Sequence, residues 1–174
     1  MPMDDLPDEL RERLQRLNAD LLTDRLRPEY AVWLACDLLM AGVESPAVME
    51  LAGESPTRLS SAHAVPLVRQ ALSELGIGSI DSLQASWVIA RDVARQMIAG
   101  GLLPEDGAAS LWGLWWACEN AEELARMLEP LEAWEETSPS DRDDEAIRAE
   151  MRRLAPAVIR AADAHLAADG IPSK

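Results

Sequence analysis

The sequence is short of the residues that build sheets: among its 174 residues are one tyrosine, three threonines and no phenylalanine. Strands favour aromatic and β-branched side chains, whereas the leucine, alanine, glutamate and arginine that are abundant here favour helices. We therefore predict an all-α fold, a compact bundle of about seven helices with no sheet. A chain of this length buries about 70% of the surface that its unfolded form exposes, so it needs no metal or disulfide for stability.

Cysteine and histidine are also scarce, with two of each. Cys36 and Cys118 lie within helical patterns, where we expect reduced core thiols, and neither is close in sequence to His63 or His165, as a zinc site requires. The sequence has no Glu-x-x-His pair, glycine-rich phosphate loop or nucleophile elbow. We predict no catalytic residues, cofactor or metal. An enzyme with carboxylate chemistry stays an alternative, because such carboxylates leave no local motif.

Basic residues number 16, all but Lys174 being arginine, against 31 acidic residues, and the net charge is −15. Binding to nucleic acid or to an anionic membrane needs a cationic face, so we expect neither, and we expect a basic protein as the partner. The N-terminal residues lack the pattern of a secretion signal, and the apolar run 30–43 is too short for a membrane span of about 20 residues. We predict a cytoplasmic protein.

Proline and glycine mark the ends of the predicted helices. The predicted helices are 6–27, 29–41, 46–53, a helix starting near Pro66 and ending at Gly76, 82–99, 105–129, and 144–168 ending at Gly170. Residues 135–144 are charged and lack apolar side chains, which predicts a loop. We predict a single helical domain over 1–174, with 76–79 as the place for any subdomain boundary. The apolar helix 29–41 is expected to be central, with Asp37 either in a structural ion pair, for which Arg91 or Arg95 could supply the cation, or at the edge of the helix.

The most distinctive segment is 101–145, in which 13 carboxylates face two arginines and which therefore carries −11 of the net charge. It also contains four of the six tryptophans: Trp112, Trp115, Trp116 and Trp134. Trp112, Trp115 and Trp116 have the i, i+3, i+4 spacing of one helix side. Trp115 falls on the predicted core stripe, and the other two fall at its flank. An aromatic anchor with an anionic rim is the composition of a binding hot spot for a basic protein.

The candidate partner-binding residues share an acidic or indole side chain in this segment. They are Trp112, Trp116, Glu119, Glu123, Glu132, Trp134 and Glu136. Glu119 with Glu123, and Glu132 with Glu136, form like-charge i, i+4 pairs that cost a few tenths of a kcal/mol in a helix and that a basic partner would relieve. The alternative is an ordinary solvated face whose tryptophans fill the core in place of phenylalanine.

A second pattern, 46–61, has the short helix, glycine and Ser/Thr-rich segment of a helix-turn-helix, so a DNA-binding regulator is a further alternative. Only Arg58 and His63 could meet phosphates there, which favours a helical hairpin of the core. Homodimerisation through the helix 29–41 or the tryptophan-rich helix is also open.

The stretch 39–53, followed by Ala71–Gly76, resembles small acidic helical proteins of unknown function from GC-rich bacteria, and Ile98–Ala109 with the tryptophan-rich segment resembles the same group. The resemblance implies an immunity or partner-binding protein without defined catalytic residues. Our leading hypothesis is therefore a non-enzymatic protein whose acidic, tryptophan-containing face binds a basic protein. Its most concrete version is an immunity- or antitoxin-like protein that neutralises a basic toxin.

Overall fold

The structure, a computed structural model, describes residues 6–168, and all of the regular secondary structure in this range is helical. The all-α prediction is confirmed. The contacts divide the chain into two units, the first ending at Ala85 and the second beginning at Ser86, and each is described by itself. The single-domain assignment and the boundary at 76–79 stay predictions.

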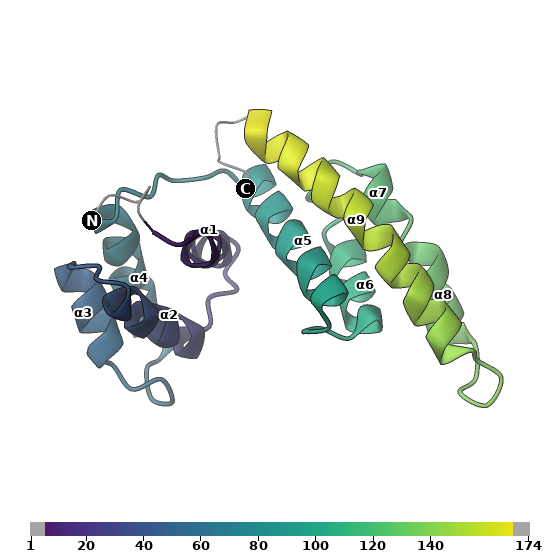
Figure 1. Ribbon diagram of the computed structural model, residues 1–174, viewed down its shortest axis with the longest axis horizontal. Helices are drawn as coiled ribbons and strands as arrows, with labels where there is room; N and C mark the ends of the chain where they lie inside the picture. Colours follow the sequence, from purple (N-terminus) through teal and green to yellow (C-terminus); the bar gives the residue numbers. More distant parts are fainter. Residues whose placement is uncertain (1–5, 169–174) are drawn as a thin grey trace. The chain divides into compact units, whose positions relative to one another are not determined.

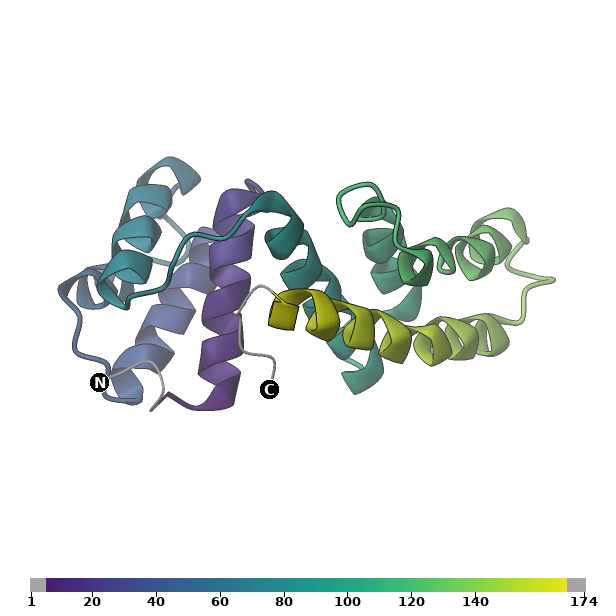
Figure 2. The ribbon, with the colours of Figure 1, turned by 90° about the horizontal axis from the view of Figure 1, so that it is seen from above.

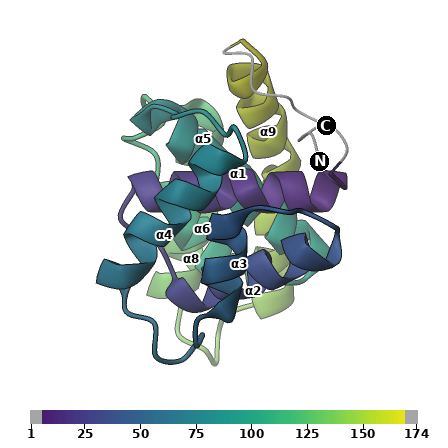
Figure 3. The same cartoon turned by 90° about the vertical axis from the view of Figure 1, so that its left-hand side faces the viewer.

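The first unit holds four helices among its described residues (Figure 3). Their buried leucine, valine and alanine side chains form one core. They are α1 (Asp8–Leu22), α2 (Pro28–Met40), α3 (Pro46–Gly53) and α4 (Ser61–Glu74). α2 and α4 both pack against α3, and α1 packs against α2 and α4. Leu14, Leu34 and Leu51 are among the fully buried side chains of this core. Leu10, Leu14 and Leu17 of α1 are buried, whereas Leu22 at the end of the helix is 48% exposed.

A hydrogen-bonded clamp fixes the start of α3. The Ser45 hydroxyl oxygen accepts the Val48 N–H at 3.2 Å, as an N-cap does, and the same hydroxyl donates to Glu74 at 2.6 Å. Glu74 also accepts the Ala47 N–H at 3.0 Å. These hydrogen bonds, that from Ser45 first, lower the pKa of Glu74 below its ordinary value. The Ser-Pro start predicted at residues 45–46 is therefore held by the end of α4.

Two predictions for the first unit are wrong. α4 begins at Ser61 and contains Pro66, because the Ser60 side chain caps the helix through the His63 N–H. Asp37 pairs with Arg13 of α1 at 2.7 Å, so its partner is not one of the two arginines predicted. α2 contacts α1, α3 and α4, as a central helix of this unit does, although Met40 at its end is 80% exposed.

The second unit contains α5 (Ser82–Ala99), α6 (Pro104–Gly113), α7 (Glu122–Ala125), α8 (Leu128–Glu136) and α9 (Asp144–Ala168). The first turn of α5, up to Ala85, is counted with the first unit. The long α9 runs beside α6, α7 and α8, and a loop joins it to α8 (Figures 1 and 2). Its inward stripe is fully buried: Met151, Ala155, Val158, Ala162 and Leu166. The predicted end of this last helix, Gly170, lies outside the described residues.

The tryptophan-rich segment does not form the single helix predicted over 105–129. It forms α6, the single turn α7 and the start of α8, so residues 6–168 contain nine helices where about seven were predicted. Pro130 does not end a helix, because it lies in the first turn of α8, where the missing N–H costs little. The predicted loop is shorter than expected, since α8 continues to Glu136.

Candidate partner-binding surface

Three tryptophans form one cluster at the end of α6. The rings of Trp112 and Trp115 are stacked, with centroids 5.0 Å apart and planes at 14°. The ring of Trp116 is tilted against that of Trp115, with centroids 4.8 Å apart and planes at 57°. Trp112 and Trp115 are half-buried, whereas Trp116 is 76% exposed. The cluster therefore presents one indole to solvent on a base formed by the other two.

The backbone after Gly113 explains why Trp116 is exposed. α6 ends there, and the chain continues in turns until α7 begins at Glu122. Glu119 and Asn120 both have positive φ, 55° and 61°, a conformation that asparagine tolerates and glutamate rarely adopts. The Asn120 N–H donates to the Trp115 carbonyl at 2.9 Å and closes the turn.

This turn changes the predicted geometry of the carboxylates. Glu119 lies before α7 and Glu123 lies inside it, so the two do not form the helical i, i+4 pair that the spacing predicted. Cys118, in the same turn, is buried as predicted. Burial raises the pKa of its thiol to about 12, so the group stays protonated at neutral pH.

Trp134 lies apart from these three in its interactions. The Arg142 guanidinium carbon is 3.5 Å from the centroid of the Trp134 ring and that of Arg148 is 4.8 Å from it. Arg142 also donates to the Trp134 carbonyl at 2.7 Å, and Arg148 binds both oxygens of Glu105 at 2.6 and 3.0 Å. The hydrogen bond from Arg148 lowers the pKa of Glu105. Trp134 therefore joins α8 to the loop and to α9, and its ring is covered by this chain's own cations.

The predicted carboxylates are not neutralised by the chain itself. Glu119, Glu132 and Glu136 are exposed and Glu123 is half-buried. Among residues 6–168 none of the four has an ion pair, although other acids of this unit do. The paired acids are Glu105, Glu122, Asp144, Glu145, Glu150 and Asp163. The described acids of this unit without an ion pair therefore include the four that the sequence singled out, together with Asp106, Glu129, Glu135, Asp141 and Asp143.

Helix geometry separates Trp134 from the carboxylates of its own helix. Residues two positions apart in an α-helix point about 200° away from each other, so Trp134 lies on the opposite side of α8 to Glu132 and Glu136. Glu129 shares the side of Glu132 and Glu136, because it precedes them by three and seven residues. The structure therefore brings the predicted acids of α8 onto one face and places Trp134 inside.

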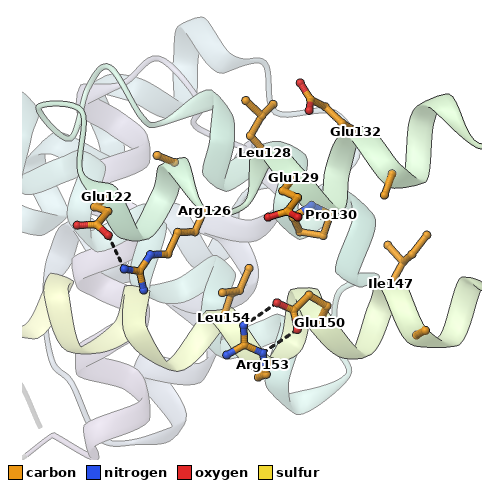
Figure 4. A pocket seen from close by; sticks show the side chains of 13 residues that line it. Glu122, Arg126, Leu128, Glu129, Pro130, Glu132, Ile147, Glu150, Arg153 and Leu154 are labelled. Atoms are coloured by element: carbon orange, nitrogen blue, oxygen red, sulfur yellow. Dashed lines mark hydrogen bonds and ion pairs between the residues drawn. The ribbon is translucent and has the colours of Figure 1, made fainter.

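A groove of about 920 Å³ lies between α7 and α8 on one side and α9 on the other (Figure 4). Its apolar lining consists of alanines and of four larger side chains from both sides: Leu128, Pro130, Ile147 and Leu154. Its charged lining comprises four carboxylates and two arginines: Glu122, Glu129, Glu132, Glu150, Arg126 and Arg153. Of the predicted residues, only Glu132 lines this groove.

Some charged side chains of the groove form ion pairs, and others have no counter-ion among the described residues. Arg126 pairs with Glu122, and Arg153 holds both oxygens of Glu150 at 2.6 and 2.7 Å (Figure 4). Glu129 and Glu132 have no ion pair among residues 6–168. The α8 side therefore carries two uncompensated negative charges beside an apolar floor.

Sequence reasoning missed this groove, although a signal was present. Ile147 and Leu154 lie beside the buried stripe of α9 and are only half-buried, because the core stripe centres on Met151 and Val158. The sequence signal for the groove was the apolar stripe of α9, which is wider than the row of side chains that packs in the core.

Two further observations describe what the structure contains. In the described part of the chain no three His, Cys, Asp or Glu side chains are grouped so that they could hold a metal ion. None of the helices within residues 6–168 has the length and apolar character that crossing a membrane requires. Comparison with known proteins gives no match: no family model, no curated protein and no solved structure is similar to this chain.

Proposed function

We propose that this chain is a non-enzymatic protein that binds a basic protein partner through the second unit. The observation that carries the proposal is the uncompensated charge of Glu119, Glu123, Glu132 and Glu136 in a unit in which six other acids form ion pairs. Exposed like charges that are left without counter-ions favour a cationic partner, and they steer it toward the surface more than they deepen its affinity.

Trp116 supplies the affinity in this proposal. An indole that is 76% exposed on a base of two further tryptophans is a preformed anchor, and burying it contributes about 2–3 kcal/mol. An arginine of the partner can lie over this ring as Arg142 lies over Trp134. Glu119, three residues further along, supplies a carboxylate for the same guanidinium.

The most concrete version is an immunity- or antitoxin-like protein in the cytoplasm. A nuclease toxin has a cationic active site, because it binds phosphates, and an acidic surface with an aromatic anchor is complementary to such a site. Trp112 and Glu123 flank the anchor in this proposal, and Trp134 supports α8 without touching the partner.

The helix-turn-helix alternative has less support. The connection between α3 and α4, residues 54–60, is seven residues long, whereas a helix-turn-helix has a turn of about three or four. A gel shift at low salt that forms no complex with DNA would remove this alternative.

The test is to capture the tagged chain from cells of its own host at low and at high salt and to identify what co-purifies. The proposal expects a basic protein that is retained at low salt and lost at high salt. Glu119→Lys with Glu136→Lys should lose it, whereas Glu50→Lys, an exposed glutamate of α3 in the other unit, should retain it. A chain that comes down alone, or that holds its partner equally in all variants, would refute the proposal.

A further inference from the structure

The groove between α7, α8 and α9 defines a more specific mode of binding, which rests on the proposed function. We propose that it receives an amphipathic helix of the basic partner. The apolar side chains of that helix contact Ile147, Leu154 and Leu128, and its basic side chains contact Glu129 and Glu132.

The apolar floor fits a helix in spacing. Ile147 and Leu154 are seven residues apart on α9, which is about 10.5 Å along the helix axis. A docked helix places its own anchors at i, i+3 or i+4, and i+7, and therefore over the same length. Both residues are half-buried, so they keep apolar surface that a ligand can remove from water.

The charges of the groove lining favour a positively charged ligand over a negatively charged one. The arginines of the groove are already bound by Glu122 and Glu150, and Glu129 and Glu132 are left to attract cations (Figure 4). An acidic helix would meet these two carboxylates unscreened, which costs affinity. A second copy of this chain would bring a net charge of −15 to the same rim, so we favour a basic partner over self-association.

The probe is a fluorescein-labelled synthetic peptide of 14 residues with leucines at i, i+3, i+4, i+7 and i+11 and arginines on the opposite face. A peptide with the same composition in scrambled order carries the same charge without an apolar face. Fluorescence anisotropy with the full chain at low salt should give at least tenfold tighter binding for the amphipathic peptide. Equal binding of the two peptides would mean that charge alone is recognised and would overturn the proposal.

Groove variants locate the site. Glu129→Lys with Glu132→Lys should weaken binding at least tenfold, and so should Leu154→Ser. Glu135→Lys with Glu50→Lys, which makes the same change of charge outside the groove lining, should weaken it less than threefold. Circular dichroism confirms that each variant is folded, and the two carboxylate variants keep the test decisive if Leu154→Ser does not fold. Groove variants that bind like the wild type would overturn the proposal.

The two proposals fail separately. Trp33, an exposed tryptophan of α2 in the other unit, is not part of the groove lining, so Trp33→Ala should leave peptide binding unchanged within twofold. If a basic partner is captured from cells but the peptide does not bind, the groove inference fails and the proposed function stands. If the peptide binds in the groove and no basic partner is captured, the proposed function fails and the helix-binding groove stands.

Discussion

The guanidinium carbon of Arg142 lies 3.5 Å from the centre of the Trp134 ring, and Arg148 lies over the same ring at 4.8 Å. Trp116 has no such cation near it within residues 6–168, and 76% of its surface is exposed. Two tryptophans of one acidic segment thus have different surroundings: one is covered by this chain's own arginines, and the other is free to meet those of a partner.

Removing the indole of Trp134 should destabilise the fold, whereas removing that of Trp116 should leave its stability almost unchanged. We predict that Trp134→Ala lowers the free energy of unfolding by about 2–3 kcal/mol, because it removes a half-buried ring and leaves Arg142 and Arg148 without their packing surface. Trp116→Ala should change it by less than about 0.5 kcal/mol, as exposed positions do. Urea unfolding followed by circular dichroism measures both. A Trp116→Ala loss as large as that of Trp134→Ala would show that Trp116 is a structural residue.

The ion pair between Glu105 and Arg148 should stabilise the fold in a pH-dependent way. The pKa of Glu105 is lowered from its ordinary 4.5 by the hydrogen bond from Arg148, so the carboxylate stabilises the folded state above that ordinary value. As the pH falls through the lowered pKa, the folded protein must protonate Glu105 and the contribution is lost. Glu105→Gln should therefore lower stability by about 1.5–3 kcal/mol at pH 7, and the difference from the wild type should shrink in acid.

Urea unfolding at pH 7 and at several values below 4.5 measures this difference. Glu135→Gln, at an exposed position of α8, is the control and should stay within about 0.5 kcal/mol of the wild type at pH 7. A Glu105→Gln effect that is the same at every pH would mean that shape and not charge holds Arg148.

The acidic face of α8 should cost the protein stability. Glu132 and Glu136 are exposed at i and i+4 in one helix, so Glu136→Gln should raise the free energy of unfolding by about 0.2–0.5 kcal/mol. The same change should weaken binding to the partner. A variant that is more stable and binds less well identifies a charge kept for function, whereas a loss of both would indicate that Glu136 has a structural contact.

α6 packs closely on α5 at Gly107. A Cβ there would overlap the side chain of Met97, which is fully buried, whereas a Cβ at Gly113 of the same helix meets open space. Gly107→Ala should therefore destabilise the fold by about 1–3 kcal/mol, and Gly113→Ala should be neutral or slightly stabilising. Thermal unfolding by calorimetry measures the two melting temperatures. Equal values would show that Met97 moves aside without cost.

Most helix ends could be predicted because residue types with strong backbone preferences mark them. Gly42, Gly76 and Gly100 have positive φ at the ends of helices, and Ser45 with Pro46 starts α3. The break after Gly113 could not be predicted, because its positive-φ residues are Glu119 and Asn120, and glutamate gives no local sign of such a turn. The predicted start of a helix near Pro66 was wrong, because the cap at Ser60 sets the start of α4.

The candidate surface was predictable in composition and not in arrangement. The excess of acid over base in 101–145 is a property of the sequence, and so is the gathering of tryptophans. Which indole is exposed depends on the turn at Glu119, and the covering of Trp134 depends on Arg148, which reaches it from another helix. The groove could not be predicted, because it depends on how closely the side chains of α8 and α9 pack against each other in the folded protein.

We propose that Trp116 and the uncompensated carboxylates bind a basic protein. The most direct measurement is the Kd of the purified partner for the wild type, for Trp116→Ala and for Glu119→Gln, by calorimetry at low and at high salt. We predict that Trp116→Ala weakens binding about 30-fold or more with its salt dependence intact, and that Glu119→Gln reduces the salt dependence. An unchanged Kd for Trp116→Ala, together with an unchanged salt dependence for Glu119→Gln, would contradict the account.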